Sequence, residues 1–152
     1  MSELTTLPLD AETRVSEAPH DHKDELRLWL RLLTCGTLGE TTSRRRLREQ
    51  FDVTLPRFDL LAQLERAADG MTLGELSRRL MVSNGNVTGL VERLVEDGLL
   101  DKTPLPHDLR VQVVMLTAKG RADFAQMAQA HESWIAELFQ GMSAPDIKTL
   151  LN

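Results

Sequence analysis

The stretch TLGELSRRLMVSNGNVTGLVERLVEDGLLDKT, residues 72–103, decides the fold of this chain. It opens with Thr72 and Glu75, which have the Ser/Thr-x-x-Glu spacing of a capping box. In a capping box each side chain satisfies a backbone N–H of the other residue at the start of a helix. We therefore predict a short helix over residues 72–80, with Leu76 and Leu80 on its apolar side.

A second helix follows after only Met81 and Val82. Ser83 is a residue type that caps helix N-termini, and Gly98 suits the left-handed backbone that commonly ends a helix. The segment 83–97 is therefore predicted to be a helix with one apolar face. That face consists of Val87, Leu90, Val91, Leu94 and Val95.

After Gly98 the apolar period changes from helical to extended. Residues 99–103 and 111–116 are predicted to be two strands of one hairpin. The loop between them is too long for a two-residue turn. It contains Pro104, Pro106, His107 and Asp108. Two short helices followed at once by a two-stranded hairpin are the element order of a helix-turn-helix with a wing.

Upstream of this head we predict a long first helix over residues 24–50, because leucines recur at near-helical spacing. These leucines are Leu26, Leu30, Leu33 and Leu38. A second helix is predicted to begin with Thr54 as its cap and Pro56 in its first turn, and to end before Gly70.

Downstream we predict another long helix, capped by Thr117 and broken by Gly141. One of its faces contains Phe124, Met127, Ala128, His131, Ile135 and Leu138. A last helix is predicted from Ser143, with Pro145 at an early helical position. The predicted fold class is therefore mainly α with a small β-hairpin wing, a winged helix-turn-helix placed between N-terminal and C-terminal helices.

The composition allows an aliphatic helical core and does not exclude a nucleic-acid partner. Of the 152 residues 41% are hydrophobic but only 4% are aromatic, so Leu, Val, Ala and Met must fill the core. The first 25 residues carry seven acidic and two basic side chains, which account for the whole formal net charge of −5. A local basic surface on the neutral remainder can still bind phosphates.

The sequence favours a cytoplasmic protein that is not an enzyme. No stretch reaches the roughly 18 uncharged apolar residues that cross a bilayer, and the N-terminus lacks the pattern of a signal peptide. Cys35 is expected in the core, with redox sensing as the alternative. The histidines are too scattered for a metal site. No nucleophile with a base and no phosphate-cradling loop is recognisable, so we predict no catalytic residue and no cofactor.

The predicted DNA contacts lie near the start of the helix over 83–97, because a helix-turn-helix lays its second helix in the major groove. They are Ser83, Asn84, Asn86 and Thr88, with Gly85 and Gly89 allowing close backbone approach. Asn can pair bidentately with adenine, and Ser and Thr can bind bases or phosphates. The alternative is that Ser83, Asn84 and Asn86 only cap a surface helix.

This head resembles the MarR family of winged-helix regulators. The resemblance is carried by MTLGELSRRLMVSNGNVTGLVERLVEDGLL, residues 71–100, and by PLPHDLRVQVVMLTAKG, residues 104–120. The wing of that family carries an Asp-x-Arg unit, which here is Asp108-Leu109-Arg110. The resemblance implies that Arg110 enters the minor groove, whose negative potential attracts arginine, and that Asp108 helps to hold the wing. The alternative is that Arg110 only pairs with Asp108 in solvent.

The same resemblance implies a homodimer that binds a pseudo-palindromic operator in double-stranded DNA. The apolar faces of the long helices agree with this, because a small head cannot bury them alone. We predict a disordered acidic tail over 1–22, a helical dimerisation region over 23–50 and 118–152, and a winged helix-turn-helix DNA-binding domain over 51–117. The alternative is a winged helix that binds proteins without reading a DNA sequence.

The first half of the chain more narrowly resembles MarR-type repressors of hydroxycinnamate or related aromatic-acid catabolism, some of which sense a coenzyme A thioester. LRLWLRLLTCGTL, residues 26–38, and RRRLREQFDVTLPRFDLLAQLERA, residues 44–67, carry this resemblance. It implies a repressor released by an aromatic acid or its thioester.

In that interpretation the arginines Arg44, Arg45 and Arg46 receive the phosphates of the effector. The apolar part of the effector is lined by Trp29, Leu33, Phe58 and Leu61. Two alternatives stay open. The arginines can form a solvated basic helix end above an ordinary core, or they can contact the DNA backbone.

Overall fold

The structure of the protein is a computed structural model that describes residues 22–152. The predicted acidic tail over 1–22 therefore lies outside the described residues, except for its last position. The elements are α2 (Lys23–Phe51), α3 (Leu55–Glu65), β1 (Met71–Thr72), α4 (Leu73–Leu80), α5 (Asn84–Glu96), β2 (Leu100–Pro104), β3 (Gln112–Leu116), α6 (Ala118–Leu138) and α7 (Ala144–Leu151). They divide into two compact units, of which the first ends at Thr42 and the second runs from Ser43 to Asn152.

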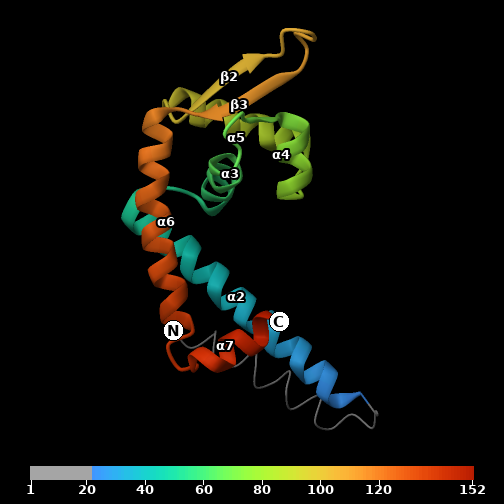
Figure 1. Ribbon diagram of the computed structural model, residues 1–152, viewed down its shortest axis with the longest axis vertical. Coiled ribbons are helices and arrows are strands. Elements are labelled where there is room, and N and C mark those ends of the chain that lie inside the picture. The colour runs from blue at the N-terminus through green and yellow to red at the C-terminus, as the bar shows by residue number, and fades with distance from the viewer. Residues whose placement is uncertain (1–21) are drawn as a thin grey trace. The chain divides into compact units, whose positions relative to one another are not determined.

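The second unit holds the predicted winged head. In Figure 1, α3, α4 and α5 lie together beneath the β2–β3 hairpin, and α6 leads away from the base of the hairpin. The largest fully buried side chains are all Leu or Val, as the low aromatic content predicted. They are Leu47, Leu60, Leu61, Leu64, Leu76, Leu94, Leu100, Val87, Val91 and Val114. The predicted fold class, mainly helical with a small β wing, is confirmed.

The sheet has three antiparallel strands in the order β1-β3-β2, which is one strand more than predicted. The two wing strands each begin one residue later than the predicted segments 99–103 and 111–116. The additional strand, β1, has only two residues, and its Met71 pairs with Val114. A strand of two residues shows no alternation in the sequence, so only the pairing itself reveals it.

The predicted capping box of α4 is present. Thr72 Oγ1 accepts a hydrogen bond from the Glu75 backbone N–H at 3.2 Å, and Glu75 Oε2 accepts one from the Thr72 backbone N–H at 2.8 Å. Three further predicted caps each accept an N–H three residues later. They are Ser83, Thr117 and Ser143.

The predicted cap of α3 is only partly correct. Thr54 occupies the capping position with an extended backbone, but its side chain makes no capping hydrogen bond. Pro56 in the first turn has no backbone N–H, so fewer donors need a partner there. The helix ends at Glu65, well before Gly70.

Two glycines place the wing relative to the helices around it. Gly98 has a φ of +74°, as predicted for the residue that ends α5. A Cβ at Gly120 would collide with the backbone carbonyl of Leu99. Thr117 donates its backbone N–H to that same carbonyl at 3.0 Å. The first turn of α6 therefore packs directly on the start of the wing.

The buried face of α6 differs from the prediction near its end. Phe124 and Met127 are buried as predicted, but Leu138 is exposed and Trp134, which was not predicted, is buried. The Trp134 ring lies 6.4 Å from the ring of Phe51 at the end of α2. This contact joins distant parts of the sequence, so helical periodicity alone could not choose between Trp134 and its neighbours.

The described residues of the first unit, 22–42, form the first part of α2. Its large apolar side chains are exposed: Leu26, Leu28, Trp29, Leu32, Leu33 and Leu38. Cys35 is exposed as well. The expectation that this thiol lies in the core is therefore wrong, because the helix surface around it is itself uncovered. No helix in residues 22–152 is long and apolar enough to cross a membrane.

Candidate nucleic-acid interface

The turn between α4 and α5 is held by the backbone and one serine. Met81 adopts a left-handed conformation with φ 55° and ends α4. Ser77 Oγ donates a hydrogen bond to the Val82 carbonyl at 2.6 Å, and the Val82 N–H donates to the Ser77 carbonyl at 3.2 Å. These bonds fix the direction in which α5 leaves the turn.

The start of α5 separates the predicted DNA contacts into two kinds. Ser83 Oγ accepts the Asn86 backbone N–H at 3.3 Å, and Thr88 Oγ1 donates to the Asn84 carbonyl at 2.9 Å. Ser83 therefore caps the helix, as the capping alternative expects, and the Thr88 hydroxyl bonds to the preceding turn of its own helix. The side chains of Asn84 and Asn86 are exposed and lie on the part of the helix that a major groove receives.

A groove of about 390 Å³ lies along α5 beside the asparagines. Pro56 of α3 and Val82 of the turn form one side of it. Its other lining residues, all on α5, are Gly85, Asn86, Gly89, Leu90 and Arg93. The sequence prediction named the glycines but missed Arg93, which lies two helical turns after Asn86. That seven-residue spacing on one face of the helix was the signal that could have found it.

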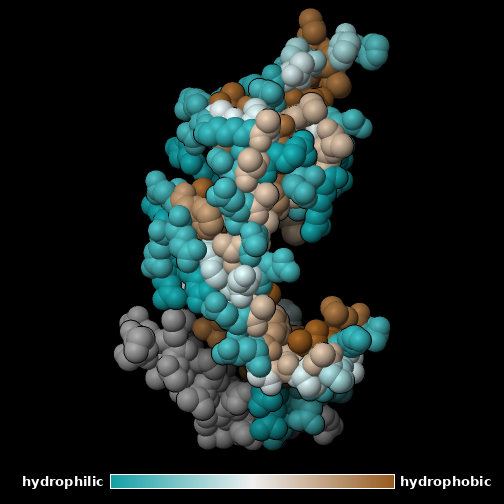
Figure 2. Space-filling model, turned by 60° about the vertical axis from the view of Figure 1, so that its left-hand side comes forward, coloured by the Kyte–Doolittle hydropathy of each residue, from teal (hydrophilic) through white to brown (hydrophobic). Residues whose placement is uncertain are grey.

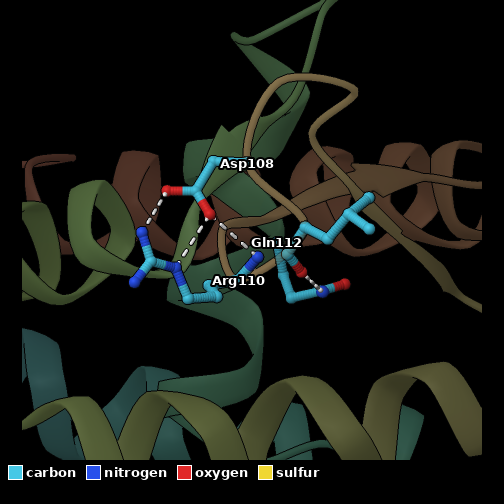
Figure 3. A network of polar contacts seen from close by, with 4 residues as sticks. Asp108, Arg110 and Gln112 are labelled. Carbon is cyan, nitrogen blue, oxygen red and sulfur yellow. Dashed lines mark hydrogen bonds and ion pairs between the residues drawn. The ribbon is translucent and has the colours of Figure 1, made fainter.

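The loop of the wing is closed by backbone hydrogen bonds. Leu105 donates its N–H to the Val111 carbonyl at 2.9 Å, and Val111 donates its N–H to the Asp108 carbonyl at 3.0 Å. Gln112 Nε2 donates to the Leu109 carbonyl at 3.3 Å (Figure 3). The hairpin protrudes from the head, and Figure 2 shows hydrophobic residues near its end. Leu109 is the most exposed of the large hydrophobic residues in this loop.

Asp108 holds Arg110 in two ways (Figure 3). Its Oδ1 accepts both the backbone N–H and the Nε–H of Arg110, each at 3.1 Å, and its Oδ2 accepts from a terminal guanidinium nitrogen at 3.4 Å. These bonds hold the pKa of Asp108 below its ordinary value. The Arg110 side chain is nevertheless 91% exposed. This geometry fits both interpretations of Arg110, as a DNA contact that Asp108 orients and as a residue that only pairs with Asp108 in solvent. A measurement of DNA binding is needed to distinguish them.

The residues predicted to line an apolar effector site do not share one surface in the second unit. Phe58 and Leu61 are buried in the core, at 6% and 0% exposure. The Phe58 ring packs against those of Phe124 and His131, with centroids 5.5 and 4.9 Å away. Trp29 and Leu33 belong to the first unit and are exposed there. The part of these residues in effector binding stays a prediction.

The three consecutive arginines also differ from one another. Arg46 forms an ion pair with Glu137 at 2.6 Å, and its guanidinium lies 5.8 Å from the centre of the Trp134 ring. The hydrogen bond between Arg46 and Glu137 raises the pKa of Arg46 and lowers that of Glu137. Arg44 and Arg45 are exposed. An anion that reached this helix end would compete with Glu137 for Arg46.

A second cavity, of about 600 Å³, lies where α2, α3, α5 and α6 meet within the second unit. Arg57 and Asp97 form an ion pair across it at 3.5 Å, and Lys119 Nζ donates to the Asp97 carbonyl at 2.9 Å. Phe51 and Met127 add apolar surface to its lining. The sequence prediction did not find this cavity, because its walls come from four separate elements.

Comparisons with known proteins agree with this geometry. The profile of the MarR family matches residues 51–110. The chain is 34% identical over 137 residues to the transcriptional activatory protein BadR of Rhodopseudomonas palustris, a match that covers 87% of this chain and 78% of the relative. It is 27% identical over 110 residues to the HTH-type transcriptional repressor IacR of Pseudomonas putida, covering 72% of this chain and 65% of the relative. A crystal structure of a mutant MarR from E. coli complexed with operator DNA superimposes with a TM-score of 0.71 and 26% identity, covering 86% and 93% of the two chains.

Proposed function

Because the chain belongs to the MarR family of DNA-binding transcriptional regulators, we propose that it acts as a homodimer on a pseudo-palindromic operator. We further propose that it represses transcription until an aromatic acid or its coenzyme A thioester releases it from DNA. Each part of this proposal is supported by separate features of the described residues.

The observation that carries the proposal is the pairing of an exposed helix start with a pre-ordered wing. Asn84 and Asn86 expose amide groups that match the donor and acceptor pattern of adenine in the major groove. Arg110 is 91% exposed and aimed by Asp108, so a narrow minor groove can take it with little ordering cost. Ser83 and Thr88 stabilise α5. The N-terminus of α5, which Ser83 caps, can also bind a DNA phosphate.

The dimer is supported by large apolar side chains that are exposed in the described part of each unit. In the first unit Trp29, Leu28 and Leu32 are each between 58% and 59% exposed. In the second unit Leu150 and Leu151 of α7 are 73% and 80% exposed. Exposed large apolar side chains that gather on one element mark an interface in soluble proteins.

The effector is proposed to bind in the cavity of about 600 Å³ in the second unit, whose volume suits a small molecule. Arg57 and Lys119 would exchange their bonds to Asp97 for a carboxylate or phosphate of the effector, while Phe51 and Met127 would contact its aromatic ring. Arg44 and Arg45 would hold further phosphates of a thioester. A ligand that changes how α6 meets the wing shifts DNA binding only by its different affinity for the two arrangements, and about 1 to 3 kcal/mol gives a 5- to 150-fold effect.

Repression is proposed because occupation of a promoter by the dimer is enough to block polymerase, whereas activation needs a further contact with polymerase. The names of the relatives point in both directions, since BadR is called an activatory protein and IacR a repressor. Transcription in vitro from a promoter that carries the bound sequence decides between the two. A rise in transcript on adding the protein would overturn the repressor proposal.

The test of the whole proposal begins with selection of bound duplexes from random DNA, using the full chain. The selected duplex should bind far more tightly than a shuffled duplex, and binding should weaken as salt rises. Titration calorimetry with 4-hydroxycinnamate and with its coenzyme A thioester, each with and without the duplex, tests the effector. DNA must weaken effector binding by the same factor by which the effector weakens DNA binding. Effector binding that the duplex leaves unchanged would contradict the proposal.

A further inference from the structure

The groove on α5 is lined by two glycines, which are unfavourable residues inside a helix. Two of its lining residues, Gly85 and Gly89, are glycines one helical turn apart, and both are exposed. Val82 and Leu90 supply apolar surface, and Asn86 and Arg93 are its polar lining residues. The result is a mostly apolar hollow next to a polar group that can read a base.

Packing within the protein does not explain these glycines. A glycine inside a helix is less stable than an alanine, because it loses more backbone freedom on folding. Beyond the backbone of its own helix and its two chain neighbours, a Cβ at Gly85 or at Gly89 would meet no atom of the described chain within 4 Å. Alanine would therefore fit at both positions and stabilise the helix. The open space is therefore free for a molecule outside the chain.

DNA is the molecule that this helix meets, because the family to which the chain belongs binds operator DNA. In the major groove the edges of the base pairs present hydrogen-bonding groups and one apolar group, the 5-methyl of thymine. Among the lining residues only Asn86 and Arg93 carry side chains that can hydrogen-bond a base, and the rest of the lining is apolar or glycine. The apolar part cannot satisfy a base amine or carbonyl. It does suit a methyl group.

We propose that this hollow receives the 5-methyl group of one thymine in each operator half-site, in contact with Val82 and Leu90. Asn86 then pairs with an adenine of the same or the adjacent base pair, so the helix reads an A·T step by shape and by hydrogen bonds together. The inference rests on the proposed operator binding, and it adds the chemical identity of one base that the helix recognises.

The experiment uses the full chain and the best duplex selected from random DNA. Each thymine is replaced in turn by deoxyuridine, which removes only the methyl group. Burial of one methyl group corresponds to about a fourfold change in affinity. We expect about a fourfold loss at one thymine position in each half-site, and about a fifteenfold loss when both are replaced. Deoxyuridine at the other thymines should have little effect.

Gly89→Ala identifies where the methyl lies. The new methyl group would project into the hollow and occupy the place proposed for the thymine methyl, so the variant should bind the selected duplex more weakly and lose the difference between thymine and deoxyuridine. It should fold at least as well as the parent, because alanine favours the helix. Gly74→Ala is the matched control, since Gly74 is an exposed helical glycine of α4 that lies outside the groove and the proposed dimerisation region, and its Cβ would also meet nothing beyond its own helix within 4 Å. This control should keep both the affinity and the deoxyuridine effect.

Three results would overturn the inference. If no thymine of a tightly bound duplex responds to deoxyuridine, the hollow does not hold a methyl group. If the response is the same in Gly89→Ala as in the parent, the methyl lies elsewhere on the protein. If selection returns no preferred duplex, the proposed operator binding fails and this inference with it.

Discussion

Removal of the Arg110 side chain should weaken DNA binding and lower its salt dependence without disturbing the fold. The side chain is 91% exposed, and within residues 22–152 its bonds run to Asp108 of the same loop. Arg110→Ala therefore takes no atoms from the core. Each charge that displaces a counterion from duplex DNA contributes about 0.9 to the slope of log K against log salt concentration. Because a dimer carries two wings, the slope should become shallower by about 2.

Fluorescence anisotropy with a labelled selected duplex, between about 50 and 200 mM salt, measures this slope. Asp108→Asn is the matched control. In the parent the Arg110 backbone N–H donates to Asp108 Oδ1 at 3.1 Å, and the asparagine amide keeps an oxygen that can accept this bond. It loses the negative charge that holds the guanidinium. This variant should keep the full slope. An unchanged slope in Arg110→Ala, or an equal loss in Asp108→Asn, would refute a direct contact of Arg110 with DNA.

Three further predictions concern the protein without DNA. His131 packs 4.9 Å from the Phe58 ring, and burial lowers its pKa although Asp59 opposes this. The folded state then binds fewer protons than the unfolded state, so the free energy of unfolding in urea should fall as pH drops from about 7.5 to 5.5, and His131→Gln should flatten that dependence. Trp134→Ala should cost about 3 to 5 kcal/mol in the same measurement, because the ring is 5% exposed, whereas a loss below about 1 kcal/mol would contradict its place in the core. Leu32→Glu should convert the dimer to a monomer in light scattering, and a dimer that survives it would move the interface away from this face of α2.

Local signals in the sequence predicted most of the head. The capping box of Thr72 and Glu75, the cap at Ser83 and the left-handed Gly98 each act within a few residues, so their effect is visible in the sequence itself. The order of the elements followed from these boundaries. The same reasoning could not see β1, because Met71 and Thr72 become a strand only by pairing with β3.

Side-chain packing between distant segments was the part that the sequence did not reveal. Trp134 is buried because Phe51 meets it from another helix. Cys35 was expected in the core, but it lies on a helix surface that its own unit leaves uncovered. In both cases the helical period is compatible with more than one buried face, and only the three-dimensional contacts choose between them.

The candidate site was predicted in unequal parts. Chemistry and spacing pointed to Asn84 and Asn86, whereas the role of Arg110 came from the family resemblance. The groove beside Arg93 could not be predicted, because Pro56 of α3 closes one side of it. The physical reason is the same as for the buried side chains of the core. A surface formed by two helices depends on how they pack together, and the sequence of one helix alone does not show that packing.

The central claim is that two copies of this chain read one DNA sequence through α5 and the wing. Sedimentation velocity of a labelled selected duplex with the full chain tests it most directly, when the shuffled duplex is run beside it at the same concentrations and salt. The account predicts a complex with the mass of two chains on the selected duplex and free DNA in the shuffled sample. A complex of one chain per duplex, or equal binding to both duplexes, would contradict it.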